Sequence, residues 1–254
     1  MKDLRGKTAF IAGGADGAGF AAERPGDGGE GMNVMIADID ETALHRAVEN
    51  LRGKNVNVRG VRTDVARRDS MRKAALETIC AFGKVHVVCN SANVPPTNGL
   101  LGCLSEGDWD RIIDINIHAV VHATEVFVPL IESHGEGGHI LNIGSAASFT
   151  VQPGGEADCG THFAVVALTE GWNEQLGPRN IGVSIVCPVV GIAPESLGRR
   201  VVDGIKNDEL YIFTQSGKFR EMVEGRFEPI REAFRKSQLS PTLRDLPARI
   251  LPFA

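Results

Sequence analysis

The sequence predicts an α/β protein with a single doubly wound parallel sheet, flanked by helices on both faces. Short Val- and Ile-rich runs alternate with longer amphipathic stretches along most of the 254 residues, a pattern typical of repeated β-α units. Most of the short runs are apolar at nearly every position, as strands buried on both faces are. Ligands in such sheets bind beyond the carboxyl ends of the strands, so functional residues are expected there.

The elements follow one another in a regular order. Strands are expected at 7–14, 32–38, 56–64, 85–92, 138–145, 182–188 and 209–214. Helices are expected at 41–53, 69–82, 106–133, 157–177 and 218–236, where apolar residues recur at helical spacing.

Composition excludes several classes of function. Apolar residues make up 43% of the chain and charged residues 23%, which is typical of a globular protein. The net charge of -5 does not favour binding to nucleic acid, which needs a basic surface. We see no run of about 20 apolar residues and no signal peptide, so we expect no membrane partner. Five scattered cysteines without metal-ligand spacing predict free thiols, no metal site and a cytoplasmic location.

Residues after the first three strands point to a dinucleotide. Gly13, Gly17 and Gly19 form a glycine turn that lets the backbone approach a pyrophosphate. Asp38 ends the second strand, where an acid can bond the adenosine ribose and repel a 2′-phosphate, which favours NAD over NADP. Asp64, after the third strand, can bond the adenine amino group. For either acid alone, a helix cap or loop acid is about as good an explanation.

The stretch EADCGTHFAVVALTEG at 156–171 carries a second candidate site. Asp158 and His162 lie four residues apart, so in a helix they share one face. Histidine titrates near neutral pH and a carboxylate can orient it, which is the arrangement that a general base needs. The simpler explanations are that Asp158 caps the helix and that His162 only fills space.

Along nearly its whole length the chain resembles the short-chain dehydrogenase/reductase family. The similar segments are the glycine turn, IADID at 36–40, TDV at 63–65, VVCNSAN at 87–93, DWDRIIDIN at 108–116, GGHILNIGS at 137–145, HFAVVALTEGW at 162–172 and GVSIVCP at 182–188. The resemblance implies one Rossmann domain over 1–254, a nicotinamide cofactor, a substrate lid, placed here at 189–208, and a homodimer or homotetramer. The Pro-rich segment 237–254 is expected to be a C-terminal arm.

The resemblance also assigns catalytic positions. Asn116 and Ser145 match the Asn and Ser of the family, whereas Asp158 and His162 stand where the family has Tyr and Lys. The single tyrosine of the chain is Tyr211, far from that motif.

Further departures lie at positions that touch the cofactor. Asn90 is kept, but Ala12, Asn93 and Val189 replace residues typical of the family, and Pro25 interrupts the helix after the glycine turn. We therefore expect no cofactor, or NAD if any.

These departures predict a protein that has lost hydride transfer. The leading hypothesis is a cofactor-independent cyclase, isomerase, lyase or dehydratase acting on an apolar, oxygenated small molecule. Asp158 and His162 would move protons, and Ser145 and Asn116 would position an oxygen. A NAD-dependent oxidoreductase with atypical proton donors is one alternative, and a non-catalytic protein that binds a metabolite or nucleotide is another. A hydrolase triad is disfavoured, since Asp158 and His162 need not point the imidazole at Ser145.

The apolar stripe at 218–236 and the arm exceed what one such domain needs to close its core. The chain is therefore expected to form a homodimer or homotetramer through these segments.

Overall fold

The computed structural model describes residues 1–13, 15, 31–94, 103–188, 192–214 and 217–238. The chain divides into two compact units, Met1–Thr214 and Gln215–Ala254. The second unit contributes one described helix, α7 (Lys218–Gln238). The single domain over 1–254 stays a prediction. The first two residues of the predicted arm at 237–254 belong to α7, and residues 239–254, like Gly17, Gly19 and Pro25, lie outside the described residues.

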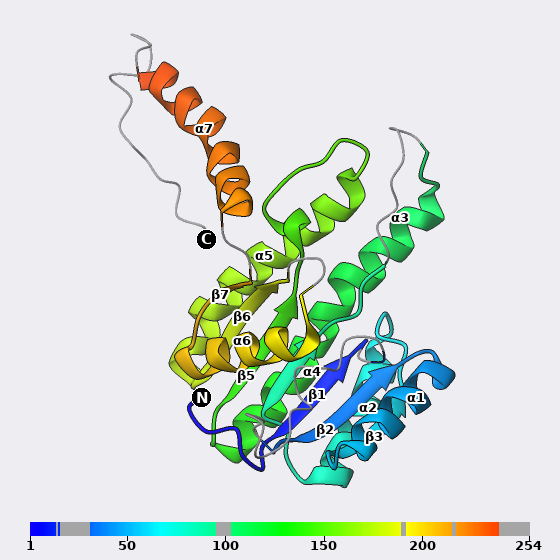
Figure 1. Ribbon diagram of the computed structural model, residues 1–254. Coiled ribbons are helices and arrows are strands. Elements are labelled where there is room, and N and C mark those ends of the chain that lie inside the picture. The colour runs from blue at the N-terminus through cyan, green and yellow to red at the C-terminus, as the bar shows by residue number, and fades with distance from the viewer. Residues whose placement is uncertain (14, 16–30, 95–102, 189–191, 215–216, 239–254) are drawn as a thin grey trace. The chain divides into compact units, whose positions relative to one another are not determined.

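Seven parallel strands form one sheet in the order β3-β2-β1-β4-β5-β6-β7, which confirms the predicted fold class (Figure 1). The strands are β1 (Thr8–Ala12), β2 (Asn33–Asp38), β3 (Asn57–Arg62), β4 (Val87–Asn90), β5 (Gly138–Ile143), β6 (Ile181–Cys187) and β7 (Tyr211–Phe213). The strand order reverses between β1 and β4, and the crevice above this point is where doubly wound sheets bind ligands.

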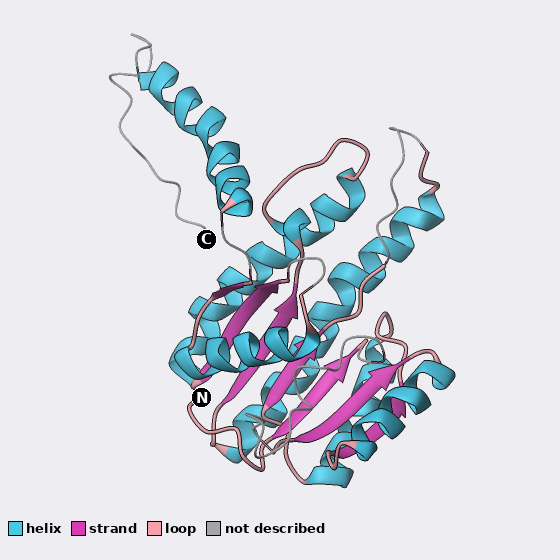
Figure 2. Ribbon diagram, viewed as in Figure 1, coloured by secondary structure: helices cyan, strands magenta, loops and turns pink. Residues whose placement is uncertain are grey.

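Helices cover both faces of the sheet (Figure 2). They are α1 (Glu41–Gly53), α2 (Arg68–Phe82), α3 (Glu106–Ile113), α4 (Ala119–His134), α5 (Glu156–Leu176) and α6 (Pro194–Asn207). Residues of α1 and α6 pack in one apolar core, and residues of α2 and α4 pack in another on the opposite face. On α1 the contacts come from Leu44, Val48 and Leu51, which recur at the spacing of one helical face.

The helix expected at 106–133 contains a π-turn that the sequence pattern did not predict. Residues Asp114–His118 form this turn between α3 and α4. It buries Asn116, and single π-turns inside helices often mark functional sites. By length and composition the run Glu106–His134 could cross a membrane, but 44% of its most apolar window is buried inside the protein. The fully buried Phe127 and Ile131 identify it as a core helix.

The predicted lid at 189–208 overlaps α6. Val201 and Ile205 of this helix are buried in the core. Residues 189–191 lie outside the described residues, and the lid stays a prediction.

The turns after β1 and β4 touch at Gly13. This residue has a φ of +72°, and a Cβ there would lie 2.3 Å from the Cα of Ala92. Only glycine fits, because both the left-handed backbone and the close approach exclude a side chain. The Ser91 amide also donates to the Ala12 carbonyl at 2.8 Å. Backbone atoms therefore build the floor of the crevice.

His139, on β5, is a buried titratable group far from this crevice. Its Nε2 lies 2.7 Å from Ser184 Oγ, and Ser184 in turn donates to the carbonyl of Glu209. Because Ser184 gives its hydroxyl proton to Glu209, His139 Nε2 carries the proton of the neutral ring. Nδ1 has no hydrogen-bond partner among the described residues, and the Asp208 carboxylate lies 4.0 Å from it. Desolvation, with a smaller effect of the chain's amino terminus, lowers the pKa of His139 to about 3.

We predict that His139 makes the fold sensitive to acid. Its folded pKa is depressed, so the unfolded chain binds more protons below its ordinary pKa of 6.5, and stability is lost as pH falls from there toward 3. Proton linkage then lowers the free energy of unfolding by about 2 kcal/mol between pH 7 and pH 5. The free energy of unfolding, measured with urea at pH 7 and pH 5, should fall less for His139→Gln than for the unmodified protein. His45→Gln, at an exposed position, should keep the full decline, and an unchanged slope in His139→Gln would contradict the prediction.

Candidate functional site

The four predicted catalytic residues lie at the carboxyl edge of the sheet. Asn116 comes from the π-turn before α4, and Ser145 follows β5 directly. Asp158 and His162 occupy the first two turns of α5, one helical turn apart. The sheet and two helices thus bring together side chains that are distant in the sequence, although the shared cavity expected for them stays a prediction.

Asp158 and His162 form a close pair. His162 Nδ1 lies 2.9 Å from the backbone carbonyl of Asp158 and 3.3 Å from its carboxylate Oδ1. A carbonyl oxygen can only accept, so Nδ1 carries a proton and the neutral imidazole has its lone pair on Nε2. The side chains are 6% and 15% exposed for His162 and Asp158. The expected sharing of one helical face is confirmed.

Asn116 is hydrogen-bonded on both ends of its amide. Its Oδ1 accepts from the backbone amide of Val94 at 3.0 Å. Its Nδ2 donates to Thr161 Oγ1 on α5, also at 3.0 Å. The side chain thus joins the segment after β4 to the helix that carries the Asp/His pair, so it holds the site together rather than standing free to react.

Ser145 begins a short 3-10 turn, Ala146–Ser148. Its Oγ accepts from the amide of Ala147 at 3.0 Å, and its own amide donates to Ser148 Oγ at 3.1 Å. The hydroxyl proton stays available for an outside acceptor. No hydrogen bond joins Ser145 to Asp158 or His162 among the described residues, which argues further against a hydrolase triad.

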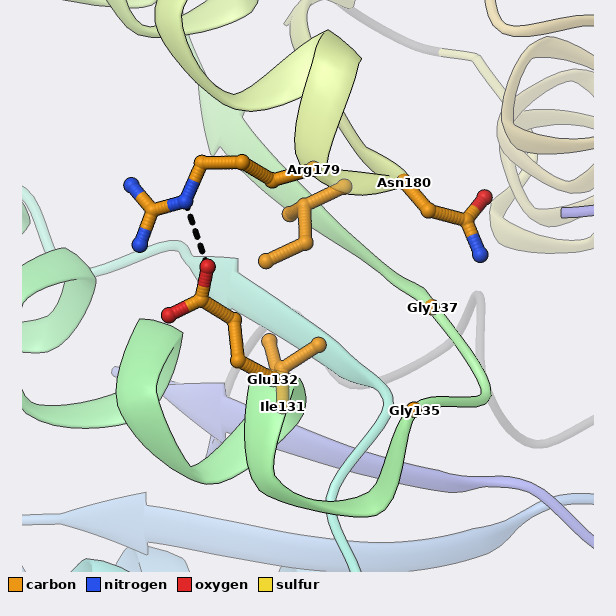
Figure 3. A pocket seen from close by; sticks show the side chains of 7 residues that line it. Ile131, Glu132, Gly135, Gly137, Arg179 and Asn180 are labelled. Atoms are coloured by element: carbon orange, nitrogen blue, oxygen red, sulfur yellow. Dashed lines mark hydrogen bonds and ion pairs between the residues drawn. The ribbon is translucent and has the colours of Figure 1, made fainter.

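A cavity of about 400 Å³ lies at the carboxyl edge and is lined by Ile39, Arg62, Asp64, Arg67, Asp69, Ser70 and Lys73. A second cavity lies at the opposite edge of the sheet. It has a volume of about 270 Å³ and is lined by Ile131, Glu132, Gly135, Gly137, Arg179, Asn180 and Ile181. Figure 3 shows the ion pair between Arg179 and Glu132 beside it. Because Gly137 and Asn180 precede β5 and β6, this cavity is at the amino ends of the strands, where doubly wound folds do not bind their ligands.

Asp38 ends β2 as expected, whereas β3 ends at Arg62, two residues before Asp64. Asp38 Oδ2 accepts from the amide of Ala15 at 3.2 Å, and its Oδ1 accepts from Asp40 at 3.0 Å. These bonds hold the Asp38 carboxylate beside Ala15, and each oxygen can accept a further bond. Asp64 Oδ1 accepts from the amide of Ala66 at 3.1 Å, as a loop acid does.

Asn90 begins a line of polar side chains that crosses the sheet. Its Nδ2 donates to Asn142 Oδ1 at 2.8 Å, and Asn142 donates to Thr169 Oγ1 on α5 at 2.8 Å. This line fixes the orientation of the Asn90 amide. Its Oδ1 is buried and has no partner among the described residues, and such an acceptor is costly unless a ligand or water donates to it.

Two histidines and a glutamate at the amino edge have the proximity of a metal site, but their bonds do not suit a metal. His86 Nδ1 accepts from the amide of Thr8, and its Nε2 faces Glu136 Oε2 at 3.0 Å. His134 Nδ1 accepts from the amide of Glu136. Its Nε2 donates to the carbonyl of Val85. The imidazole lone pairs thus accept hydrogen bonds from the protein and are not free to bind a metal. The bonds of this cluster stabilise the amino edge of the sheet.

Sequence reasoning did not single out Thr161, Asn142 or Thr169. Buried threonines and asparagines in helices and strands are common, and no spacing in the sequence distinguishes these. Their partners lie 27 to 52 residues away in the sequence, so only the assembled fold identifies them.

Comparisons with known proteins give the chain a family. Residues 7–193 match the short chain dehydrogenase family. The chain is 26% identical to the C alpha-dehydrogenase of Sphingobium sp. strain SYK-6 over 282 residues, which cover 95% of this chain and 90% of that protein.

Solved structures are also similar to this chain. The apo form of LigO from Sphingobium sp. strain SYK-6 has a TM-score of 0.88 and 31% identity, with 97% of this chain and 100% of that chain covered. A short chain dehydrogenase/reductase from Burkholderia phymatum, solved in complex with NAD, has a TM-score of 0.84 and 27% identity, with 92% and 97% covered.

These relatives overturn the expectation that hydride transfer is lost. They are named dehydrogenases, and one is solved with NAD, so the prediction of a cofactor-independent isomerase, lyase or cyclase is wrong. The side chain of Asn93 is exposed. Between β1 and β4 the contacts of the described turns are made by the backbone, with Ala12 accepting from the Ser91 amide and Gly13 lying against Ala92. The chain belongs to the short chain dehydrogenase family.

Proposed function

We propose that this protein is a NAD-dependent oxidoreductase that interconverts a secondary alcohol and a ketone of an apolar small molecule, with His162 as the proton acceptor and donor. The observation that carries the proposal is the bond from His162 Nδ1 to the Asp158 carbonyl at 2.9 Å. It places the lone pair of the neutral imidazole on Nε2, on a scaffold whose relatives are dehydrogenases.

The residues at the crevice suit a dinucleotide. The backbone at Gly13 allows close approach, and Asp38 holds a carboxylate beside it for the adenosine ribose. Asp64 would bond the adenine, and the orphaned Asn90 Oδ1 would accept a bond from a group in the crevice. Gly17 and Gly19 complete the turn in the sequence. The carboxylate of Asp38 disfavours a 2′-phosphate, so we propose NAD rather than NADP.

The proton chemistry falls to residues of this chain. When bound, the cofactor supplies the acceptor or donor of the hydride. The family uses a Tyr-x-x-x-Lys pair, which we propose is replaced here by Asp158 and His162. During oxidation, His162 Nε2 takes the hydroxyl proton of the alcohol, and the resulting imidazolium keeps its Nδ1–H toward Asp158. The carboxylate at 3.3 Å stabilises that charge.

Ser145 and the surrounding apolar residues would orient the substrate. The hydroxyl of Ser145 can donate its proton to the substrate oxygen, because its bond with the Ala147 amide uses only a lone pair of Oγ. Val94, Ile112 and Ala157 form an apolar cluster, in which Val94 donates its amide to Asn116 and Ala157 directly precedes Asp158. An apolar surrounding favours an apolar substrate and strengthens each polar contact made within it.

We also propose that the protein acts as a homodimer or homotetramer in the cytoplasm. The support is the apolar face of α7, whose Met222, Phe227, Ile230 and Phe234 are 39–66% exposed. Apolar faces of this kind mark contact surfaces. All five cysteines are free thiols, which agrees with a reducing compartment.

We predict that His162→Ala lowers NAD-linked kcat about 100-fold or more, because the proton acceptor is lost. Asp158→Asn should lower it about 10-fold, since the backbone carbonyl still fixes the tautomer. NADH production from a panel of secondary alcohols gives kcat, and NADH fluorescence titration gives the Kd, which should stay unchanged.

The matched control is His118→Ala. His118 pairs with Asp114 at the same spacing, but both side chains are about half exposed, so kcat should stay near that of the unmodified protein. Full activity of His162→Ala together with a dead Asp158→Asn would assign the proton to Asp158 instead. Absence of NAD-linked turnover in the unmodified protein would overturn the proposed function.

We predict that Phe227→Glu shifts the assembly toward smaller species in sedimentation velocity, because a charge on the apolar face of α7 opposes its burial. Glu221→Lys, on the opposite face of that helix, should leave the distribution unchanged. An unchanged oligomer in Phe227→Glu, or a monomeric unmodified protein, would argue against a role for α7.

A further inference from the structure

We infer that Thr161 is a positioning residue that couples Asn116 to the His162 base. The inference rests on the function proposed above, but its physical core is a set of hydrogen bonds that can be tested without a substrate. Thr161 lies on α5 between Asp158 and His162, and 3% of it is exposed.

The hydroxyl of Thr161 accepts and donates at once. Its Oγ1 accepts from Asn116 Nδ2 at 3.0 Å. The same oxygen lies 3.0 Å from the carbonyls of Ala157 and Asp158, which share its single proton. A hydroxyl that accepts from an amide becomes a stronger donor, so these bonds reinforce one another.

The backbone carbonyl of Asp158 links Thr161 to His162. It accepts from Thr161 Oγ1 and from His162 Nδ1, at 3.0 Å and 2.9 Å. The hydroxyl therefore helps to fix the oxygen that sets the tautomer of His162. Through Asn116, which also accepts from the amide of Val94, the same bonds extend to the segment after β4.

A buried helical threonine often bonds only the carbonyl four residues earlier, and Thr124 of α4 does so at 2.8 Å from Val120. Thr161 differs in two respects. It accepts from a side-chain amide, and it reaches the carbonyl that His162 also uses. Thr124 is buried to a similar extent, which makes Thr124→Val a matched control.

Replacing Thr161 by valine keeps the volume and removes the hydroxyl. The Asn116 Nδ2 then lacks its acceptor, and the Asp158 carbonyl loses one of the two side-chain donors that hold it. We expect both the first turns of α5 and the bond from His162 Nδ1 to become less firmly fixed, so that a second tautomer of the imidazole becomes populated. A small misplacement of a catalytic group costs up to about 100-fold in rate.

The test is ¹⁵N NMR of histidine-labelled full-length protein, with the His162 signals assigned by their loss in His162→Gln. We expect the Nδ1–H tautomer in the unmodified protein and in Thr124→Val, a mixture of tautomers in Thr161→Val, and recovery in Thr161→Ser. In parallel, kcat of Thr161→Val should fall about 10- to 100-fold, with the Kd for NADH within about twofold of the unmodified value and recovery in Thr161→Ser.

An unchanged tautomer in Thr161→Val would overturn the inference, as would an equal change in Thr124→Val. If Thr161→Val does not fold, Thr161→Ala takes its place with the same expected results. If the unmodified protein turns over no alcohol with NAD, the proposed function fails, and the tautomer of Thr161→Val alone then decides this inference.

Discussion

The two hydrogen bonds of the buried Asn116 amide hold the site together. They join the segment after β4, through Val94, to α5, through Thr161. The π-turn that contains Asn116 adds a residue to the helix and aims its side chain inward. This tie acts together with the line from Asn90 through Asn142 to Thr169, which also joins α5 to β4.

Much of the fold could be predicted from the sequence because its signals are local. Apolar runs located the strands, and helical periodicity placed Asp158 and His162 on one face. The π-turn could not be predicted, because an inserted residue leaves the apolar pattern of 106–133 nearly unchanged. Thr161 could not be identified either, since its importance comes from a partner 45 residues away in the sequence.

The prediction that hydride transfer is lost was wrong. It treated each unusual side chain near the crevice as a lost contact with the cofactor. The described turns after β1 and β4 meet through backbone atoms, since Gly13 lies against Ala92 and the Ala12 carbonyl accepts from the Ser91 amide. Changes of side chain leave such backbone contacts in place, whereas the proposed proton chemistry rests on the side chains at 158 and 162.

In the proposed mechanism, His162 takes the part that a tyrosine has in the family. The bond at Nδ1 puts the lone pair of the neutral imidazole on Nε2. That lone pair would accept the hydroxyl proton when an alcohol is oxidised.

The most direct test of this account is transfer of deuterium from NADH labelled at the hydride position of the nicotinamide ring. The unmodified protein is incubated with the labelled cofactor and a panel of apolar ketones, and the products are examined by mass spectrometry. The account predicts an alcohol with deuterium on the carbinol carbon, formed at least 100-fold more slowly by His162→Ala. Bound NADH with no deuterated alcohol from any ketone, or equal rates for the two proteins, would contradict it.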